Sequence, residues 1–355
     1  MERMNASPNR IPQLDGLRAI AILLVLMSHF WMYDVSHDGL NRLFQSGWMG
    51  VDLFFVLSGY LITDILLKTR QSPVYFRKFY LRRTLRIFPP YYVLLVLTFL
   101  LLPLLHPLSE RLRDDEWMFW LYVGNFVFAA HGWQNLRALN LTWSLAIEEQ
   151  FYLVWPALVR FVNGRFGAVC VVICAILPVV RFALWRAGVP WTWMHMMMPL
   201  RADSFAWGAL VALYPRRFAW ASTLVAPIAI FTWLRQYYEP QELVGTIGYS
   251  MNAACAAGLI SWALAGGTFA RILSWRPLRY IGEVSYGIYL YHAFCFMAID
   301  YVVHFHHTIL GGLEQIVVTT AVSLGVASLS YHFFERPILK LKDRLTLSVP
   351  QPAMR

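Results

Sequence analysis

Residues 14–30 read LDGLRAIAILLVLMSHF, an apolar run with charged residues at its start and His29 near its end. At about 1.5 Å per residue, a helix places His29 roughly 16 Å beyond Arg18, about half of a hydrocarbon core that is about 30 Å thick. Eleven residues at about 100° each also return the His29 side chain to nearly the same helix face as Arg18. We therefore predict a membrane-spanning helix that carries His29 to mid-membrane on a face turned inward.

The depth of His29 is what makes it a candidate functional residue. An ionisable side chain at mid-membrane costs several kcal/mol unless a partner or a polar cavity receives it. The alternative is a histidine that only hydrogen-bonds a neighbouring helix, and this stretch alone does not separate the two interpretations.

The rest of the chain is equally apolar. Of its 355 residues, 58% are hydrophobic and 14% are charged, and apolar runs of membrane length recur throughout. We therefore predict an all-α protein, a polytopic bundle of transmembrane helices without a separate soluble domain. Eleven stretches are candidate spans: 17–34, 48–67, 89–105, 117–131, 141–161, 166–186, 201–214, 219–236, 243–268, 284–303 and 311–334.

Basic residues predict which loops face the cytoplasm. They collect in a loop from 68 to 86, in another from 271 to 279, and in the tail after 335. Because both termini are then cytoplasmic, the number of crossings is even. We predict ten spans, with 117–131 or 201–214 as the stretch that does not cross. The same pattern accounts for the net charge of +10, so we predict membrane lipid as partner, and no nucleic acid.

No metal site is predicted. His304, His306 and His307 lie at the end of a predicted span without matching acidic or cysteine ligands, which favours a solvated loop. The four cysteines are expected to be buried thiols inside apolar stretches: Cys170, Cys174, Cys255 and Cys295.

Arginines are dense in residues 79–91, FYLRRTLRIFPPY, where a Pro-Pro pair is expected to break the helix. On a helix Arg83 and Arg86 share a face, and their guanidinium groups can bind phosphates through paired hydrogen bonds. Anchoring to anionic lipid is the alternative. The use of arginine alone at these positions favours phosphate, so we predict a cofactor site at Arg83 and Arg86, with Arg82 and Tyr91 beside them.

Residues 140–153, NLTWSLAIEEQFYL, place two adjacent carboxylates in a predicted span. Neighbours on a helix point about 100° apart, so the two cannot face the same cavity. Glu148 shares a face with Tyr152, so we predict that Glu148 points inward, where it orients His29 or joins a charge network with arginine. For Glu149, a salt bridge without a catalytic part is an open alternative.

Other ionisable groups have simpler explanations. Asp52, predicted at the outer membrane boundary, could cap its helix. Arg201 and Asp203 are predicted to close a local ion pair. His292 lies inside a predicted span, and we rank it below His29 because the tyrosines beside it could satisfy it.

Taken together, these segments resemble the acyltransferase-3 family of integral-membrane acyltransferases. The resemblance covers residues 11–341 as one transmembrane domain and leaves 342–355 as a cytoplasmic tail. Six motifs carry it, in order along the chain: Arg18 and His29 with ten residues between them, Phe54 to Gly59, Arg83 with Arg86, Trp143 to Leu153, Ser285 to His292, and Glu335 to Pro337.

The resemblance implies an O-acyltransferase that moves an acyl group, with acetyl favoured, from cytoplasmic acyl-CoA to a hydroxyl of a carbohydrate or lipid-linked glycan. Acetyl-CoA is then the donor substrate, no metal takes part, and the protein is expected in a bacterial cytoplasmic (inner) membrane. Some family members carry an additional periplasmic esterase-like domain. Because only 18 residues follow Pro337, we expect a stand-alone enzyme without that module.

The mechanism that follows begins with acyl-CoA phosphates binding the predicted cofactor arginines. A neutral His29 then removes the proton of the acceptor hydroxyl, or itself carries the acyl group across the bilayer. Glu148 or Asp15 would hold the required tautomer of His29, and Arg18 would steady the cofactor or the developing negative charge.

A proton-coupled transporter or flippase of a lipid-linked glycan is the alternative function. It would also explain the intramembrane charges, but not the arginine segment together with the motif that begins at Trp143. The sequence leaves open the acyl chain, the acceptor and the position modified, and the oligomeric state.

Overall fold

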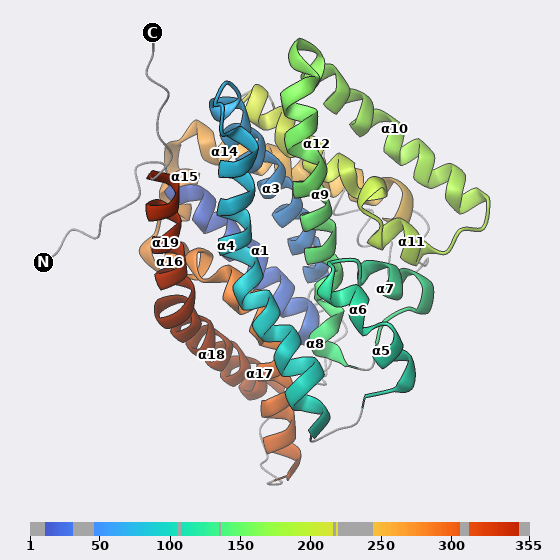
Figure 1. The fold of residues 1–355 in the computed structure, drawn as a ribbon, viewed down its shortest axis with the longest axis vertical. Coiled ribbons are helices and arrows are strands. Elements are labelled where there is room, and N and C mark those ends of the chain that lie inside the picture. The colour runs from blue at the N-terminus through green and yellow to red at the C-terminus, as the bar shows by residue number, and fades with distance from the viewer. Residues whose placement is uncertain are drawn as a thin grey trace, which may run out of the picture.

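The computed structural model describes residues 11–30, 46–104, 108–134, 136–215, 218, 244–305 and 312–347. These residues form helices joined by short turns, and there is no strand among them (Figure 1). The α-helices are α1 (Pro12–Phe30), α3 (Met49–Thr69), α4 (Tyr75–Val96), α5 (Glu110–Asp114), α6 (Glu116–Trp120), α7 (Asn125–His131), α8 (Arg137–Asn140), α9 (Thr142–Phe161), α10 (Phe166–Arg186), α11 (Trp191–Met196), α12 (Met198–Leu213), α14 (Tyr249–Ala265), α15 (Gly267–Leu273), α16 (Arg276–Glu283), α17 (Ser285–Phe305), α18 (Gly312–Ser330) and α19 (Arg336–Leu347). Short 3₁₀ or π turns extend or join them at Ser46–Trp48, Leu97–Leu101, Leu102–Leu104, Asn163–Arg165, Val244–Gly248 and Tyr331–Glu335.

Several helical segments turn large apolar side chains outward. Val179 on α10 and Val317 on α18, for example, are each 66% exposed. Apolar surface of this extent is unfavourable in water, so these faces contact lipid and the protein is an integral membrane protein. Six segments of the described chain are long and apolar enough to cross a membrane: Ser46–Thr69, Tyr75–Leu104, Asn163–Arg186, Gly245–Ala265, Ser285–Val303 and Glu314–Leu341.

The centre of the bundle contains α1, α3, α12 and α14, and glycines set the spacing of its helices. A Cβ on Gly208 of α12 would lie 2.1 Å from the Val56 carbonyl oxygen of α3. A Cβ on Gly59 would lie 2.2 Å from the Phe205 carbonyl oxygen. The backbones of α3 and α12 therefore touch, as small residues allow between membrane helices.

A methyl group at this contact is expected to destabilise the protein. Gly208→Ala would push α12 away from α3, because the clashing atom belongs to the backbone, and we expect the free energy of unfolding to fall by about 1–3 kcal/mol. Gly325→Ala is the control, since a Cβ there meets no atom within 4 Å. Thermal unfolding in detergent measures both variants, and equal midpoints would contradict the tight contact.

Helix α4 corrects two predictions. Residues 75–86 of the expected loop and 89–96 of the expected span belong to one helix, which contains Pro89 and Pro90. The hydroxyl of Tyr286 donates to the Ile87 carbonyl at 2.8 Å. This bond ties α17 to α4 beside the two prolines. The arginines before the two prolines therefore lie on a helix inside the bundle and not in a loop.

The other predicted spans agree with the observed helices to different degrees. The stretch 166–186 coincides with α10, and 201–214 forms α12. The stretch 117–131 is not a single span, because it divides into α6 and α7 where Tyr122 has a φ of 56°. A residue with positive φ ends a right-handed helix. The stretch 219–236 lies outside the described residues.

The basic segments share one end of the bundle. A Cβ on Gly16, near the start of α1, would clash with the backbone of Leu273 at the end of α15, and one on Gly282 of α16 with the backbone of Asp15. Helices α15 and α16 accordingly lie beside α1, and α19 packs against α4 (Figure 1). We call this the basic end. The expected tail is helical as far as Leu347, and residues from 348 on lie outside the described part.

Candidate active site

A cavity of about 100 Å³ lies between α1, α3, α4, α9 and α17. Apolar side chains line its wall together with guanidinium groups, one carboxylate and several hydroxyls. The bundle around the cavity is otherwise apolar. Helices from distant parts of the chain thus build one polar chamber. Its polar and charged lining residues are Arg18, Ser58, Arg83, Arg86, Ser144, Glu148, Tyr152, Ser285, Tyr286 and Tyr289.

Positive charge dominates this cavity. Arg18 pairs with Asp15 at 3.2 Å. No described residue forms an ion pair with Arg83 or Arg86. The Arg83 guanidinium instead lies 5.4 Å from the ring centre of Tyr152. Two guanidinium groups without a carboxylate partner suit the cavity to an anion such as phosphate.

Glu148 is the carboxylate in the cavity wall. Its Oε1 accepts hydrogen bonds from the hydroxyls of Ser58 on α3 and Tyr152 on α9. Glu149 does not line the cavity, because successive residues on α9 point about 100° apart. Glu148 thus ties α9 to α3 and balances part of the arginine charge.

Three other predicted site residues lie outside the cavity wall. Asp15 is buried behind Arg18, its ion-pair partner. Tyr91 is buried, and its hydroxyl donates to the Phe119 carbonyl at 2.8 Å. Arg82 is next to a lining arginine in sequence but points elsewhere around α4. The cavity therefore contains two of the four predicted cofactor residues.

His29 lies in the last described turn of α1. The helix begins at Pro12, earlier than the expected start at 17, and its 19 residues are about 28 Å long. The His29 side chain is exposed and does not line the cavity. It therefore lies away from the basic end, beyond the arginines.

The tautomer of His29 follows from its own helix. Its Nδ1 lies 2.8 Å from the Val25 carbonyl oxygen, which can only accept, so Nδ1 carries the proton and Nε2 keeps its lone pair. The prediction that Glu148 or Asp15 holds this tautomer is wrong, because both carboxylates have other partners. The backbone instead presents His29 Nε2 as the free base.

His292 on α17 is the neighbour that the sequence ranked too low. The ring centres of His292 and His29 are 4.8 Å apart. His292 is buried, and its Nδ1 lies 2.7 Å from the Tyr289 carbonyl oxygen, while its Nε2 has no hydrogen-bond partner among the described residues. The flanking tyrosine hydroxyls therefore do not satisfy it, and two imidazoles with free Nε2 atoms lie side by side.

Tyr289 separates the cavity from this histidine pair. Its ring lines the cavity and lies 6.0 Å from the His292 ring and 6.4 Å from the Phe54 ring. Its hydroxyl contacts the Ser144 hydroxyl at 2.5 Å. The sequence contained a signal for this arrangement, since Ser285, Tyr289 and His292 recur at helical spacing on one face.

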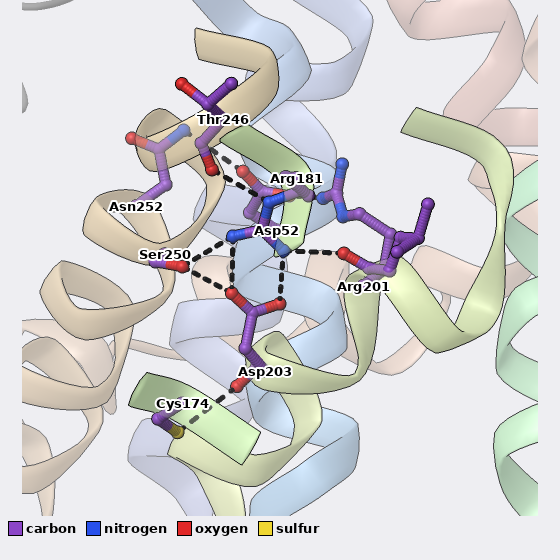
Figure 2. A network of polar contacts seen from close by, with 9 residues as sticks. Asp52, Cys174, Arg181, Arg201, Asp203, Thr246, Ser250 and Asn252 are labelled. Atoms are coloured by element: carbon purple, nitrogen blue, oxygen red, sulfur yellow. Dashed lines mark hydrogen bonds and ion pairs between the residues drawn. The ribbon is translucent and has the colours of Figure 1, made fainter. Parts of the chain in front are cut away.

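A second set of buried charges, which the sequence analysis missed, lies between α3, α10, α12 and α14 (Figure 2). Two nitrogens of Arg181 donate to the two carboxylate oxygens of Asp203, at 3.1 and 2.8 Å. Arg201 forms a second ion pair with Asp52. All four side chains are buried, and polar side chains of α14 donate to both carboxylates.

The predicted local pair between Arg201 and Asp203 is therefore wrong. Residues two apart on a helix point about 200° apart, so each must find its partner on another helix. Arg201 reaches Asp52 on α3, and Asp203 reaches Arg181 on α10. The sequence contained a signal, because Arg181 inside an apolar stretch requires a buried partner.

Arg201 also contacts His195 on α11, a short helix outside the six membrane-spanning segments. Nδ1 of His195 lies 2.7 Å from the Tyr249 hydroxyl and 3.4 Å from Nη1 of Arg201. Burial and the positive charge of Arg201 both lower the pKa of His195, so its imidazole is neutral. Because arginine only donates, Nδ1 accepts and the ring proton lies on Nε2.

No metal centre is found in the described part of the chain. No three histidine, cysteine, aspartate or glutamate side chains there are placed to hold an ion. The side chains of His304, His306 and His307, predicted to belong to a solvated loop, lie outside the described residues.

Comparison with known proteins gives the class of the chain. Residues 11–332 match the family model of an acyltransferase domain, Acyl_transf_3, and the chain belongs to this family. The match includes every helix that lines the cavity or carries the histidine pair. No solved structure matches the chain.

The named relatives include YrhL and two OatA proteins. The peptidoglycan O-acetyltransferase OatA of Listeria monocytogenes is 30% identical over 93% of this chain. YrhL of Bacillus subtilis is 30% identical over 92%, and the O-acetyltransferase OatA of Staphylococcus aureus 27% identical over 94%. The chain spans only 55%, 56% and 58% of the lengths of YrhL and the two OatA proteins, respectively.

Proposed function

We propose that this protein transfers an acyl group, with acetyl favoured, from acyl-CoA to a hydroxyl of a cell-wall glycan. The observation that carries the proposal is a cavity in which two arginines form no ion pair with any described residue. Next to it lie two imidazoles whose Nε2 atoms no described residue binds, in a member of an acyltransferase family. The glycan acceptor is suggested by the relatives named peptidoglycan O-acetyltransferases.

The donor enters from the basic end in this proposal. With ten spans and both termini in the cytoplasm, the basic end faces the cytoplasm, where acyl-CoA is present. Arg83 and Arg86 bind CoA phosphates through charge-assisted hydrogen bonds. The thioester then points along the cavity toward Tyr289, which must turn aside for the acyl group to reach His29.

His29 acts on the acceptor in this mechanism. Its Nε2 removes the hydroxyl proton as the hydroxyl oxygen attacks the thioester carbonyl. The carbon–oxygen bond forms, the carbon–sulfur bond breaks with its electron pair on sulfur, and Nε2 passes the proton to the thiolate. In the second version, His29 Nε2 first attacks the thioester carbonyl, and the carbon–sulfur bond breaks with its electron pair on sulfur. The acceptor hydroxyl then attacks the carbonyl of the acyl-imidazole, the carbon–nitrogen bond breaks with its electron pair on Nε2, and the hydroxyl proton passes to the thiolate.

The test uses the purified protein in detergent with [¹⁴C]acetyl-CoA and solubilised peptidoglycan. We expect radioactive, ester-linked acetyl groups on the glycan without any ion gradient. Label that stays on acetyl-CoA, combined with gradient-driven glycan movement in proteoliposomes, would instead identify a transporter and overturn the proposal. Mass spectrometry of the glycan gives the acyl group and the position modified.

Removing one cavity arginine is expected to weaken donor binding. Arg86→Ala should raise KM for acetyl-CoA about 10- to 100-fold, because a hydrogen bond between charged groups is worth about 1.5–3 kcal/mol. The turnover of bound substrate should change much less. Arg77→Ala is the matched control, since Arg77 is exposed on the same helix and does not line the cavity. An unchanged KM in both Arg86→Ala and Arg83→Ala would contradict the assignment of the phosphate site.

A further inference from the structure

Three tryptophan rings surround His195. The His195 ring centre lies 4.3 Å from that of Trp143, 5.5 Å from that of Trp191 and 6.3 Å from that of Trp133. The three come from separate parts of the chain: the start of α9, the start of α11, and the turn between α7 and α8. We call these four residues the tryptophan cluster.

Trp133 is the exposed member of the tryptophan cluster. Its side chain is 48% exposed, whereas Trp143 and His195 are buried. Trp133 lies in the turn between the short helices α7 and α8, outside the six candidate membrane-spanning segments. Tryptophans of a membrane-interface belt anchor a helix to the head groups, whereas these three converge on one imidazole.

His195 offers the cluster a fixed hydrogen-bond donor. Its Nδ1 accepts from Tyr249 and faces Arg201, which Asp52 holds in place, so the ring proton lies on Nε2. No described residue accepts a hydrogen bond from this Nε2. A neutral N–H donor between aromatic rings is therefore available to a ligand.

The cluster adjoins the proposed reaction chamber. The Trp143 ring contacts the Phe55 ring at 6.3 Å between centres, and Phe55 lines the cavity. Ser144 and Leu145, the next residues on α9, also line it. A ligand on the tryptophan cluster is thus one side chain away from the chamber that is proposed to receive the thioester.

We propose that the tryptophan cluster is the acceptor subsite and binds one pyranose ring of the glycan. A pyranose has apolar C–H faces that pack against indole rings, and hydroxyl or amide oxygens at its edge that accept a hydrogen bond from His195. Exposed Trp133 closes over one face of the sugar, while Trp143 and Trp191 form the floor. This inference rests on the proposed function and assigns the acceptor side of it.

The test replaces Trp133. Trp133→Ala should weaken binding of chitotetraose, the soluble probe, at least about tenfold in a titration that follows tryptophan fluorescence, because a large aromatic contact is lost. Trp133→Phe should retain part of the affinity. Trp117→Ala is the control, since Trp117 is 57% exposed on neighbouring α6 and makes no contact with His195.

Kinetics give a second readout. In the acetylation assay, Trp133→Ala should raise KM for the glycan at least about tenfold and leave KM for acetyl-CoA unchanged. A wild-type protein that does not bind chitotetraose, or a Trp133→Ala variant that binds it as tightly as wild type, overturns the subsite. Failure of the wild type to use acetyl-CoA instead overturns the proposed function, and the titration decides the subsite in that case too.

Discussion

Replacing His29 with alanine or glutamine is expected to lower acyl transfer by about 10²- to 10⁴-fold, the usual contribution of a positioned general base. The reason is the loss of Nε2, the basic ring nitrogen. In the wild type the Val25 carbonyl holds the ring proton on Nδ1, so Nε2 keeps its lone pair. Alanine removes the base, and the glutamine amide cannot take up a proton near neutral pH. The rate of label transfer from [¹⁴C]acetyl-CoA to glycan measures the effect.

The fold is expected to survive these substitutions. The His29 side chain is exposed, so its removal leaves no cavity in the bundle. His131→Ala is the matched control, because His131 is an exposed histidine at the end of α7. All three variants should unfold at the wild-type temperature in detergent. A folded His29→Ala protein with full activity would refute both versions of the mechanism.

Omission of the acceptor separates the two versions. If His29 carries the acyl group, wild-type protein should retain label from [¹⁴C]acetyl-CoA that neutral hydroxylamine removes, and His29→Ala should retain none. If His29 is only the base, neither protein should be labelled, although His29→Ala is still inactive.

The second large effect is expected at Arg181 and Asp203. Asp203→Asn should lower the free energy of unfolding by about 3–5 kcal/mol, because it leaves a charged guanidinium without its partner in a site from which water is excluded. Both side chains are fully buried, and the pair holds α10 to α12. Denaturant or thermal unfolding in detergent measures the loss.

A surface pair provides the control. Asp64→Asn removes the partner of Lys68, whose side chain is 68% exposed, and such pairs contribute about 0–1 kcal/mol. Replacing both buried partners, in Arg181→Met with Asp203→Leu, should recover part of the lost stability, because no charge is then left unpaired. Equal losses of unfolding free energy in Asp203→Asn and Asp64→Asn would show that the buried pair stabilises the protein no more than the surface pair does.

Local pattern in the sequence was enough for several features. Apolar runs predicted helices such as α10, and helical spacing put Glu148 and both Arg83 and Arg86 on faces that line the cavity. These features depend on the 3.6-residue period of one helix, so the residues within a single stretch contain the information. The same reasoning did not predict the continuation of α4 through Pro89 and Pro90. Proline removes a hydrogen bond inside a helix, so whether the helix continues depends on its packing against other helices.

Partner choice was decided only by the tertiary structure. Asp52 and Arg201 are 149 residues apart in the chain, and His29 meets His292 only because α1 and α17 lie together. A buried charge or imidazole needs a partner, and its type predicts that one exists, but nothing in the local sequence states which helix provides it. Membrane helices pack through small residues and shape, so the contacts that select these partners arise only when the whole bundle has assembled.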